Sequence, residues 1–179
     1  MLKLEDTVLV VIDIQGKLAH LVHNKEELFK NARLMIQGAR VLEVPILLTE
    51  QYPQGLGPTI PEIAELLEGV EPITKTAFSC CGEKSFSEAF IELERSQALL
   101  IGIETHVCVW QTVHDLLDSE YEVQVAADAV SSRSPINKEI GLQKMLNAGA
   151  KITCVETALF ELMRVAEGPK FKAVSKLVK

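Results

Sequence analysis

The amino-acid sequence predicts a three-layer α/β/α sandwich, a Rossmann-like fold with a six-stranded parallel sheet between two helical layers. Short apolar runs alternate with longer amphipathic segments along most of the 179 residues. The runs are rich in valine, isoleucine and leucine, which is typical of strands buried on both faces. Strands separated by helices join most naturally through right-handed crossovers onto a parallel sheet. Because no internal repeat or linker interrupts this alternation, we expect one domain over residues 1–179.

The composition suits layered helices and strands better than a surface on which nucleic-acid bases stack. Apolar residues make up 47% of the chain, which is enough for a sizeable core, whereas aromatic residues make up only 5%. The formal net charge of −7 argues against nucleic acid or an anionic membrane as the main partner. No apolar stretch is long enough to span a bilayer, and the first residues lack a cleavable apolar segment. The four cysteines have no metal-binding or disulfide-scaffold spacing, so we expect a reducing, cytoplasmic location.

The first half of the chain supplies three strands. Thr7 to Ile12 is almost entirely β-branched or leucine and is followed by Asp13. A helix over residues 24–43 carries one apolar side, and a second strand follows at 44–49. The glycines and prolines of residues 50–61 indicate a surface loop, and Pro61 suits the first turn of a short helix to about Leu67. The third strand, residues 72–76, carries Lys75 near its end.

The second half repeats the alternation. Ser85, with Glu88 three residues later, resembles a capping box for a helix to about Glu94. Three further strands are predicted at residues 98–101, 121–127 and 151–155. Helices are predicted from residue 105 onward, over 135–147 and over 156–165. The basic residues of the C-terminal tail indicate a solvated helix face.

A cysteine opens the helix that follows the fourth strand. Thr105 is a plausible N-cap, because apolar residues recur at helical spacing beyond it. Cys108 is then the third helical residue, where free backbone N–H groups and the helix dipole favour a thiolate. The alternative is a buried structural cysteine, since free cysteine is among the most buried residue types.

Polar side chains follow several of the predicted strands. Asp13, Glu50, Lys75, Cys108 and Asp128 all lie at or just beyond a strand end. In open parallel sheets, ligands bind beyond the carboxyl ends of the strands. Each residue also has a structural interpretation: an aspartate can cap the next turn, and a lysine can be solvated. For Asp128 we favour the structural role, as a cap of the loop over residues 129–134.

An acid, an amine and a thiol at one edge of a sheet would support covalent hydrolysis. A thiolate can attack a carbonyl carbon and form a thioester. Asp13 could take the thiol proton and return it to the leaving amine, while Lys75 would favour the anionic forms of its neighbours. Backbone N–H groups before the helix would stabilise the oxyanion. The four histidines show no metal-ligand spacing, so we expect neither a metal nor another cofactor.

Three separately spaced segments resemble those of the isochorismatase-like cysteine hydrolase family. They are VVIDIQ, which contains Asp13, KTAFS, which contains Lys75, and GIETHVCVWQT, which contains Cys108. The resemblance covers nearly the whole chain and implies a catalytic triad of these three residues. It also implies a cis peptide bond between Ile103 and Glu104, which would place the N–H groups of Glu104 and Cys108 in an oxyanion hole. The family's members commonly form homo-oligomers, so we expect a dimer, tetramer or larger assembly.

The chain also departs from particular members of that family. Nicotinamidases hold a metal with an Asp-x-His pair and a further histidine, whereas the corresponding residues here are Glu50, Gln51 and Tyr52. Isochorismatases of the phenazine type lack the cysteine. Cys80 and Cys81 lie outside the motif and are interpreted as loop or pocket-wall residues. The residues expected to line the pocket are Gln15, Glu50, Tyr52, Phe78, Thr105 and His106.

The leading hypothesis is therefore a cysteine hydrolase that cleaves an amide-like C–N bond of a small molecule without a metal. One alternative is an ester or enol-ether hydrolase that uses Asp13 as a general acid. Another is a catalytically silent binding or scaffold protein with the same fold. A flavodoxin-like nucleotide module is disfavoured, because Asp13-Ile14-Gln15-Gly16 contains no glycine-rich phosphate loop.

Overall fold

The computed structural model describes residues 1–179 and contains one six-stranded sheet in the order β3-β2-β1-β4-β5-β6. Every neighbouring pair of strands is parallel, which confirms the predicted fold class. The strands are β1 (Thr7–Ile12), β2 (Ile46–Gln51), β3 (Ile73–Lys75), β4 (Gln97–Ile103), β5 (Glu122–Ser131) and β6 (Lys151–Thr153).

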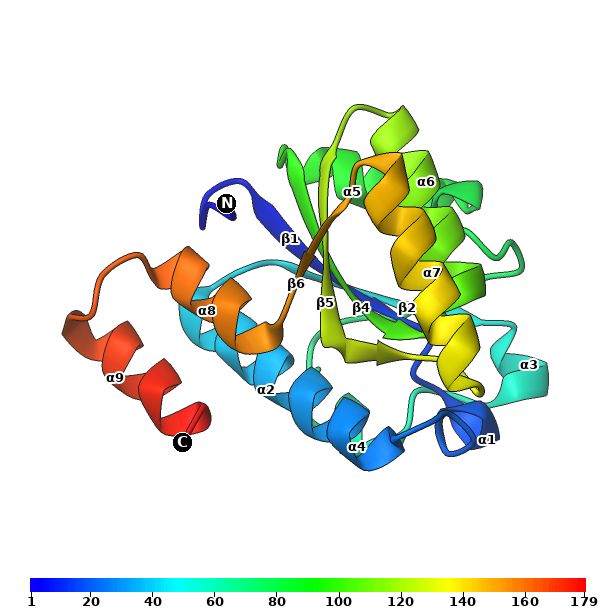
Figure 1. The fold of residues 1–179 in the computed structure, drawn as a ribbon, viewed down its shortest axis with the longest axis horizontal. Coiled ribbons are helices and arrows are strands. Elements are labelled where there is room, and N and C mark those ends of the chain that lie inside the picture. The colour runs from blue at the N-terminus through cyan, green and yellow to red at the C-terminus, as the bar shows by residue number, and fades with distance from the viewer.

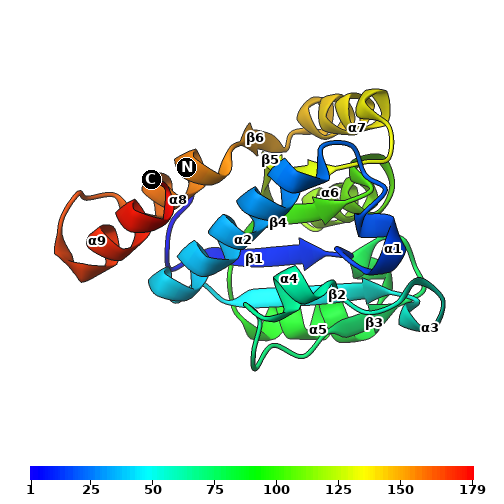
Figure 2. The same cartoon turned by 90° about the horizontal axis from the view of Figure 1, so that it is seen from below.

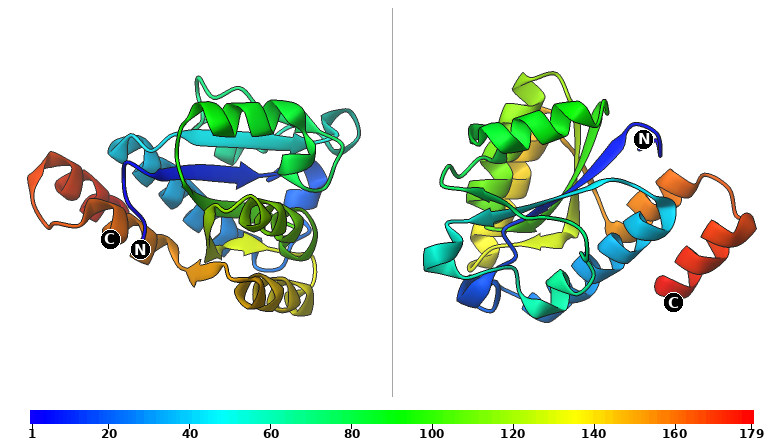
Figure 3. Two further views of the ribbon diagram at one scale, coloured as in Figure 1. Left: turned by 90° about the horizontal axis from the view of Figure 1, so that it is seen from above. Right: turned by 180° about the vertical axis from the view of Figure 1, so that it is seen from behind.

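Helices cover both faces of the sheet, with α2, α4, α8 and α9 on one side and α5, α6 and α7 on the other (Figures 1 and 3). Their bounds are α1 (Gly16–Ala19), α2 (Lys25–Leu42), α3 (Pro53–Leu56), α4 (Pro61–Ala64), α5 (Lys84–Glu92), α6 (Trp110–Asp118), α7 (Pro135–Ala148), α8 (Val155–Met163) and α9 (Gly168–Leu177). A 3₁₀ turn (Cys80–Gly82) precedes α5, and a π-helical turn (Thr105–Val109) precedes α6. No helix is both long enough and apolar enough to cross a bilayer.

The side chains of β1 show why its sequence is apolar throughout. Leu9 and Val11 belong to the core beneath α2 and α8, whereas Val8, Val10 and Ile12 belong to the core beneath α5, α6 and α7. Successive residues of a strand point to opposite faces. A strand covered by helices on both faces therefore has no solvent-facing position for a polar residue, as predicted from the continuous apolar run.

The carboxyl ends of the strands form one edge, and α1 and α3 lie beside it (Figure 2). The central strands approach each other closely near this edge. Gly102 of β4 has a φ of 145°, and a Cβ built on it would lie 2.2 Å from the Ile12 carbonyl oxygen. A side chain there would be both strained and in collision with β1, so the sequence GIE before the π-helical turn depends on the glycine.

Three strands, β2, β4 and β5, end later than predicted, and in β2 and β5 this changes the interpretation of the last residues. β2 continues through Glu50 and Gln51, and β5 continues through Ser131. Asp128 therefore lies inside β5 rather than after it, and its carboxylate accepts a hydrogen bond of 2.9 Å from the Val155 N–H. The prediction that Asp128 caps the loop over 129–134 is wrong, because the carboxylate instead satisfies a free N–H at the start of α8.

The predicted capping box of α5 is also wrong. The helix begins at Lys84, and Glu83 occupies the cap position. Ser85 is already helical, and its hydroxyl donates to the Glu83 carboxylate at 3.3 Å. Residues 53–56 form α3 inside the predicted loop, with Pro53 at its first turn.

Candidate active site

Asp13 follows β1 directly and is buried at the carboxyl edge of the sheet. Its φ of 54° is left-handed, a conformation that aspartate tolerates better than most residues. One carboxylate oxygen, Oδ1, accepts a hydrogen bond of 2.8 Å from the Thr49 hydroxyl. The other, Oδ2, accepts one of 2.7 Å from the Lys75 ammonium. Both oxygens are thus held in place by donors from the next two strands of the sheet.

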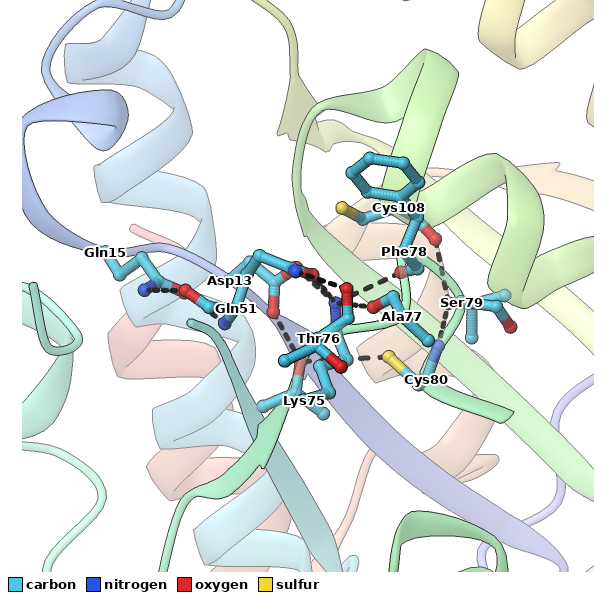
Figure 4. Close-up of polar contacts among 12 residues, drawn as sticks. Asp13, Gln15, Gln51, Lys75, Thr76, Ala77, Phe78, Ser79, Cys80 and Cys108 are labelled. Atoms are coloured by element: carbon cyan, nitrogen blue, oxygen red, sulfur yellow. Dashed lines mark hydrogen bonds and ion pairs between the residues drawn. The ribbon is translucent and has the colours of Figure 1, made fainter. Parts of the chain in front are cut away.

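Lys75, the last residue of β3, has a fully buried side chain whose ammonium group is surrounded by acceptors (Figure 4). It donates to Asp13, to Gln51 Oε1 at 2.8 Å, and to the carbonyls of Phe78 at 3.0 Å and Ala77 at 3.3 Å. An ammonium carries three N–H donors, so these partners use its whole capacity. Lys75 therefore fixes the Asp13 carboxylate and the loop after β3, and is not the solvated lysine of the alternative interpretation.

Cys108 lies in the π-helical turn, with only 6% of its surface exposed. Burial raises the pKa of its thiol, and the charge of Asp13 raises it further, whereas the charge of Lys75 lowers it. Together these effects raise the pKa of Cys108 above that of an ordinary thiol, which favours the protonated form at neutral pH. The helix position favours a thiolate, but burial and the neighbouring carboxylate act in the opposite direction on the pKa of Cys108.

The buried thiols make the folded state sensitive to alkali. Burial raises the pKa of Cys80 to about 12 and that of Cys81 to about 11, and the pKa of Cys108 is raised as well. A raised folded-state pKa stabilises the fold below the unfolded pKa, and this contribution is lost as the pH increases toward the folded value. We expect the thermal unfolding midpoint to fall between about pH 9 and pH 11, with a shallower slope in Cys81→Ala. A flat profile over this range would contradict the assignment.

The turn before Cys108 differs from the predicted one. The structure contains no cis peptide bond, so the bond between Ile103 and Glu104 is trans and that expectation is corrected. Glu104 instead adopts a left-handed φ of 56° and precedes the π-helical turn. Thr105 is therefore not the N-cap: it is the first residue of the turn, and its buried hydroxyl has no hydrogen-bond partner. The chain reverses at Glu104 through a left-handed residue rather than through a cis bond.

Contacts from the segment after β5 hold the Glu104 turn. The Glu104 carboxylate accepts hydrogen bonds of 3.3 Å from the backbone N–H and the guanidinium of Arg133. Nδ1 of His106 lies 3.1 Å from the Ser132 hydroxyl. These contacts fasten the left-handed residue and the first part of the π-helical turn to the end of β5.

The six residues expected to line a pocket have different roles. Gln15 is buried; its side-chain amide donates to the carbonyls of Gln51 and Gly57 and accepts from the Gln51 N–H. Glu50 is buried, and its Oε1 accepts from the Thr59 N–H at 2.6 Å and hydroxyl at 2.7 Å. Both residues fasten the loop after β2, a structural function that the sequence did not reveal.

Two of the other expected pocket residues are exposed near the Lys75 loop. Tyr52 and Phe78 each expose 54% of their surface, and the backbones of both contact Lys75. His106 is partly exposed, whereas Thr105 is buried. No group of three or more His, Cys, Asp or Glu side chains is arranged to hold a metal ion.

Sequence reasoning missed three neutral residues that support the site. Gln51 accepts a hydrogen bond from Lys75, Thr49 donates one to Asp13, and the Thr112 hydroxyl donates one of 2.7 Å to the Cys108 carbonyl. Their positions carried a weak signal: Thr49 and Gln51 flank Glu50 at a predicted strand end, and Thr112 follows Cys108 by one helical turn. The strand-end rule selects charged and nucleophilic residues, whereas these three side chains are neutral.

Comparison with known proteins gives a consistent result over the whole chain. A family model described as the isochorismatase domain matches residues 7–157. Isochorismatase domain-containing protein 2 of Homo sapiens is 39% identical over 173 residues, covering 97% of this chain and 83% of that protein. The Danio rerio protein of the same name is 37% identical over 177 residues, covering 99% of this chain and 89% of its own length.

Solved structures agree with the sequence matches. The structure of the MAR1 ribonuclease from Caenorhabditis elegans is similar at a TM-score of 0.93 and 38% identity, covering 99% of this chain and 91% of that one. The YcaC gene product of Escherichia coli, described as an octameric hydrolase of unknown specificity, is similar at a TM-score of 0.93 and 22% identity, covering 98% and 88%. The second similarity concerns the fold alone.

Proposed function

The chain belongs to the isochorismatase family, and on this premise we propose that it is a cysteine hydrolase that cleaves an amide-like C–N bond of a small molecule. The observation that carries the proposal is the buried Asp13 carboxylate, which Lys75 holds at 2.7 Å and whose charge raises the pKa of the Cys108 thiol. A base fixed beside a nucleophile is the arrangement that covalent hydrolysis requires.

The proposed reaction begins with a neutral thiol. Asp13 accepts the proton of Cys108 as the sulfur attacks the carbonyl carbon, so an S–C bond forms and the carbonyl π bond opens to an oxyanion. We propose the backbone N–H of Cys108 as its donor; the second expected donor, the Glu104 N–H, depended on a cis bond that is trans in the structure. The C–N bond then breaks, and the proton held by Asp13 passes to the leaving amine. Water, deprotonated by Asp13, hydrolyses the thioester and restores the thiol.

The resting thiol explains why the base must be close. Since burial and Asp13 raise the pKa of Cys108, little thiolate is present at neutral pH. Proton transfer therefore has to accompany the attack. Lys75 uses its donors on Asp13, Gln51 and backbone carbonyls, so we assign it to positioning the base rather than to giving a proton to substrate.

The direct test is to trap the acyl group on the enzyme. The protein would be incubated with a panel of small amides and quenched in acid, and its peptides would be analysed by mass spectrometry. We expect an acyl adduct on Cys108, and no adduct on the half-buried Cys154. If no amide acylates Cys108 while esters or enol ethers are hydrolysed, the alternative in which Asp13 acts as a general acid would replace this proposal. A panel without any turnover, together with a stable protein complex, would favour the binding protein.

The ribonuclease name belongs to the nematode relative and is not carried over to this chain. The net charge of −7 weighs against a polyanionic substrate, since phosphate binding depends on basic side chains. The proposed partner is therefore a small molecule rather than a nucleic acid or a membrane, and the proposed location is the cytoplasm. We further propose a homo-oligomer, for which the octameric YcaC protein is a structural precedent.

A further inference from the structure

Cys80 is buried beside the proposed catalytic residues but has no part in the reaction described above. It begins the 3₁₀ turn that follows the Lys75 loop. Its backbone N–H donates to the Thr112 hydroxyl at 2.9 Å, and its thiol donates to the Thr49 hydroxyl at 3.7 Å. One residue thus contacts two buried threonines that come from different layers of the fold, α6 and β2.

Each threonine is also hydrogen-bonded to one of the proposed catalytic residues. The Thr112 hydroxyl accepts from Cys80 and donates to the Cys108 carbonyl at 2.7 Å. The Thr49 hydroxyl accepts from the Cys80 thiol and donates to Asp13 Oδ1 at 2.8 Å. A hydroxyl has a single hydrogen, so each threonine commits its only donor to the catalytic residue. Both threonines are completely buried, so water does not compete for these bonds.

The structure assigns Thr49, Cys80 and Thr112 a common role, as a buried chain of hydrogen bonds that fixes the Asp13 carboxylate relative to the Cys108 turn. The assignment deepens the proposed function and rests on it, because it concerns the base and the nucleophile named there. All three are positioning residues: they act on the reaction through Asp13 and Cys108.

The protonation of Cys80 suits a donor rather than a second nucleophile. Burial raises the pKa of this thiol to about 12, so the S–H group is retained at neutral pH. The thiol is a weak donor, but the Thr49 hydroxyl that accepts its bond is aimed at Asp13. A hydrogen-bonding role accounts for a cysteine at this position without requiring redox or covalent chemistry.

The same hydrogen bonds also connect the proposed nucleophile with the loop that holds Lys75. The carbonyls of Ala77 and Phe78 accept from Lys75, and Cys80 lies two residues further along the same loop (Figure 4). Asp13 is therefore located from two directions, by Lys75 on Oδ2 and by Thr49 on Oδ1. Loss of one support should move the base or the nucleophile, and a displacement of about 1 Å can cost about 100-fold in rate.

The test uses the whole protein with p-nitrophenyl acetate, an activated ester that reports acylation of a nucleophile through release of p-nitrophenolate. Thr112→Val and Thr49→Val keep the side-chain shape and remove the hydroxyl. We expect each to lower the acylation rate of Cys108 by about 10- to 100-fold with little change in KM. Thr112→Ser and Thr49→Ser, which restore the hydroxyl, are expected to regain most of the rate.

Thr7→Val is the matched control. Thr7 is equally buried, and its hydroxyl donates to the Lys3 carbonyl at 2.7 Å, at the opposite end of β1. This variant should lower the unfolding midpoint without changing acylation. The double variant of Thr49 and Thr112 should be about as slow as the slower single variant, because both substitutions interrupt one chain. If a valine variant does not fold, Thr112→Ala replaces it in the comparison with Thr112→Ser.

The outcomes separate the two proposals. Wild-type protein that is not acylated at Cys108 would overturn the proposed function and this assignment with it. Acylation in the wild type that is unchanged in the valine variants would overturn the assignment alone. A double variant slowed by the product of the two single effects would also overturn it, since independent sites are additive.

Discussion

Replacement of Cys108 by alanine is expected to reduce amide turnover by at least about 1,000-fold while the protein stays folded. The substitution removes the sulfur atom on which the proposed thioester would form, so the proposed covalent route is blocked. Asp13, Lys75 and the backbone of the turn keep their hydrogen bonds, because the Cys108 side chain makes none of these bonds. Turnover per folded molecule, with circular dichroism as the check on folding, measures the effect.

A matched cysteine variant distinguishes the loss of the nucleophile from the loss of a cysteine in general. Cys154 lies at the start of α8, where its thiol contacts the Thr157 hydroxyl at 3.1 Å. Cys154→Ala should retain the wild-type turnover. Full activity in Cys108→Ala would instead select the ester or enol-ether mechanism, in which Asp13 protonates the leaving group and no thioester forms.

The strands were predictable because their environment leaves little choice of residue. Thr7 to Ile12 is observed with the predicted bounds, since a parallel strand between two helical layers must be apolar on both faces. The ends of β2 and β5 were underestimated, because Glu50 and Asp128 are polar residues whose partners lie elsewhere in the chain. Glu50 is satisfied by Thr59, and Asp128 by the N–H of Val155. Composition and periodicity are local properties of the sequence and do not identify partners that are distant along the chain.

For the candidate site, the positions of the residues were predictable, whereas the charge state of the thiol and the geometry of the turn were not. The rule that ligands bind at the carboxyl ends of parallel strands selected Asp13, Lys75 and Cys108, and the structure joins the first two directly. The charge state of the thiol could not be read in this way, because it depends on burial and on the carboxylate next to it. The trans bond and left-handed Glu104 were equally hidden, because a family resemblance supplied the expected turn geometry.

Replacement of Lys75 by methionine is expected to lower the free energy of unfolding by about 3–5 kcal/mol and to abolish turnover. Methionine fills a similar volume but leaves the Asp13 carboxylate buried without its cation. Gln51 Oε1 and the Phe78 carbonyl also lose their donor. Removing one partner of a buried ion pair costs more than the pair contributes, because the remaining charge is still desolvated. Urea unfolding at neutral pH measures the change.

A second substitution separates the effect on stability from the effect on catalysis. In the Lys75→Met background, Asp13→Asn removes the uncompensated charge, so part of the lost stability should return. Activity should not return, because an amide cannot accept the thiol proton. If the double variant were no more stable than Lys75→Met, the cost would come from the lost loop contacts rather than from the charge. If it were active, Asp13 would not be the base. The two roles proposed for the Asp13–Lys75 pair, one in folding and one in the reaction, thus predict opposite results in the same variant: stability partly returns and activity does not.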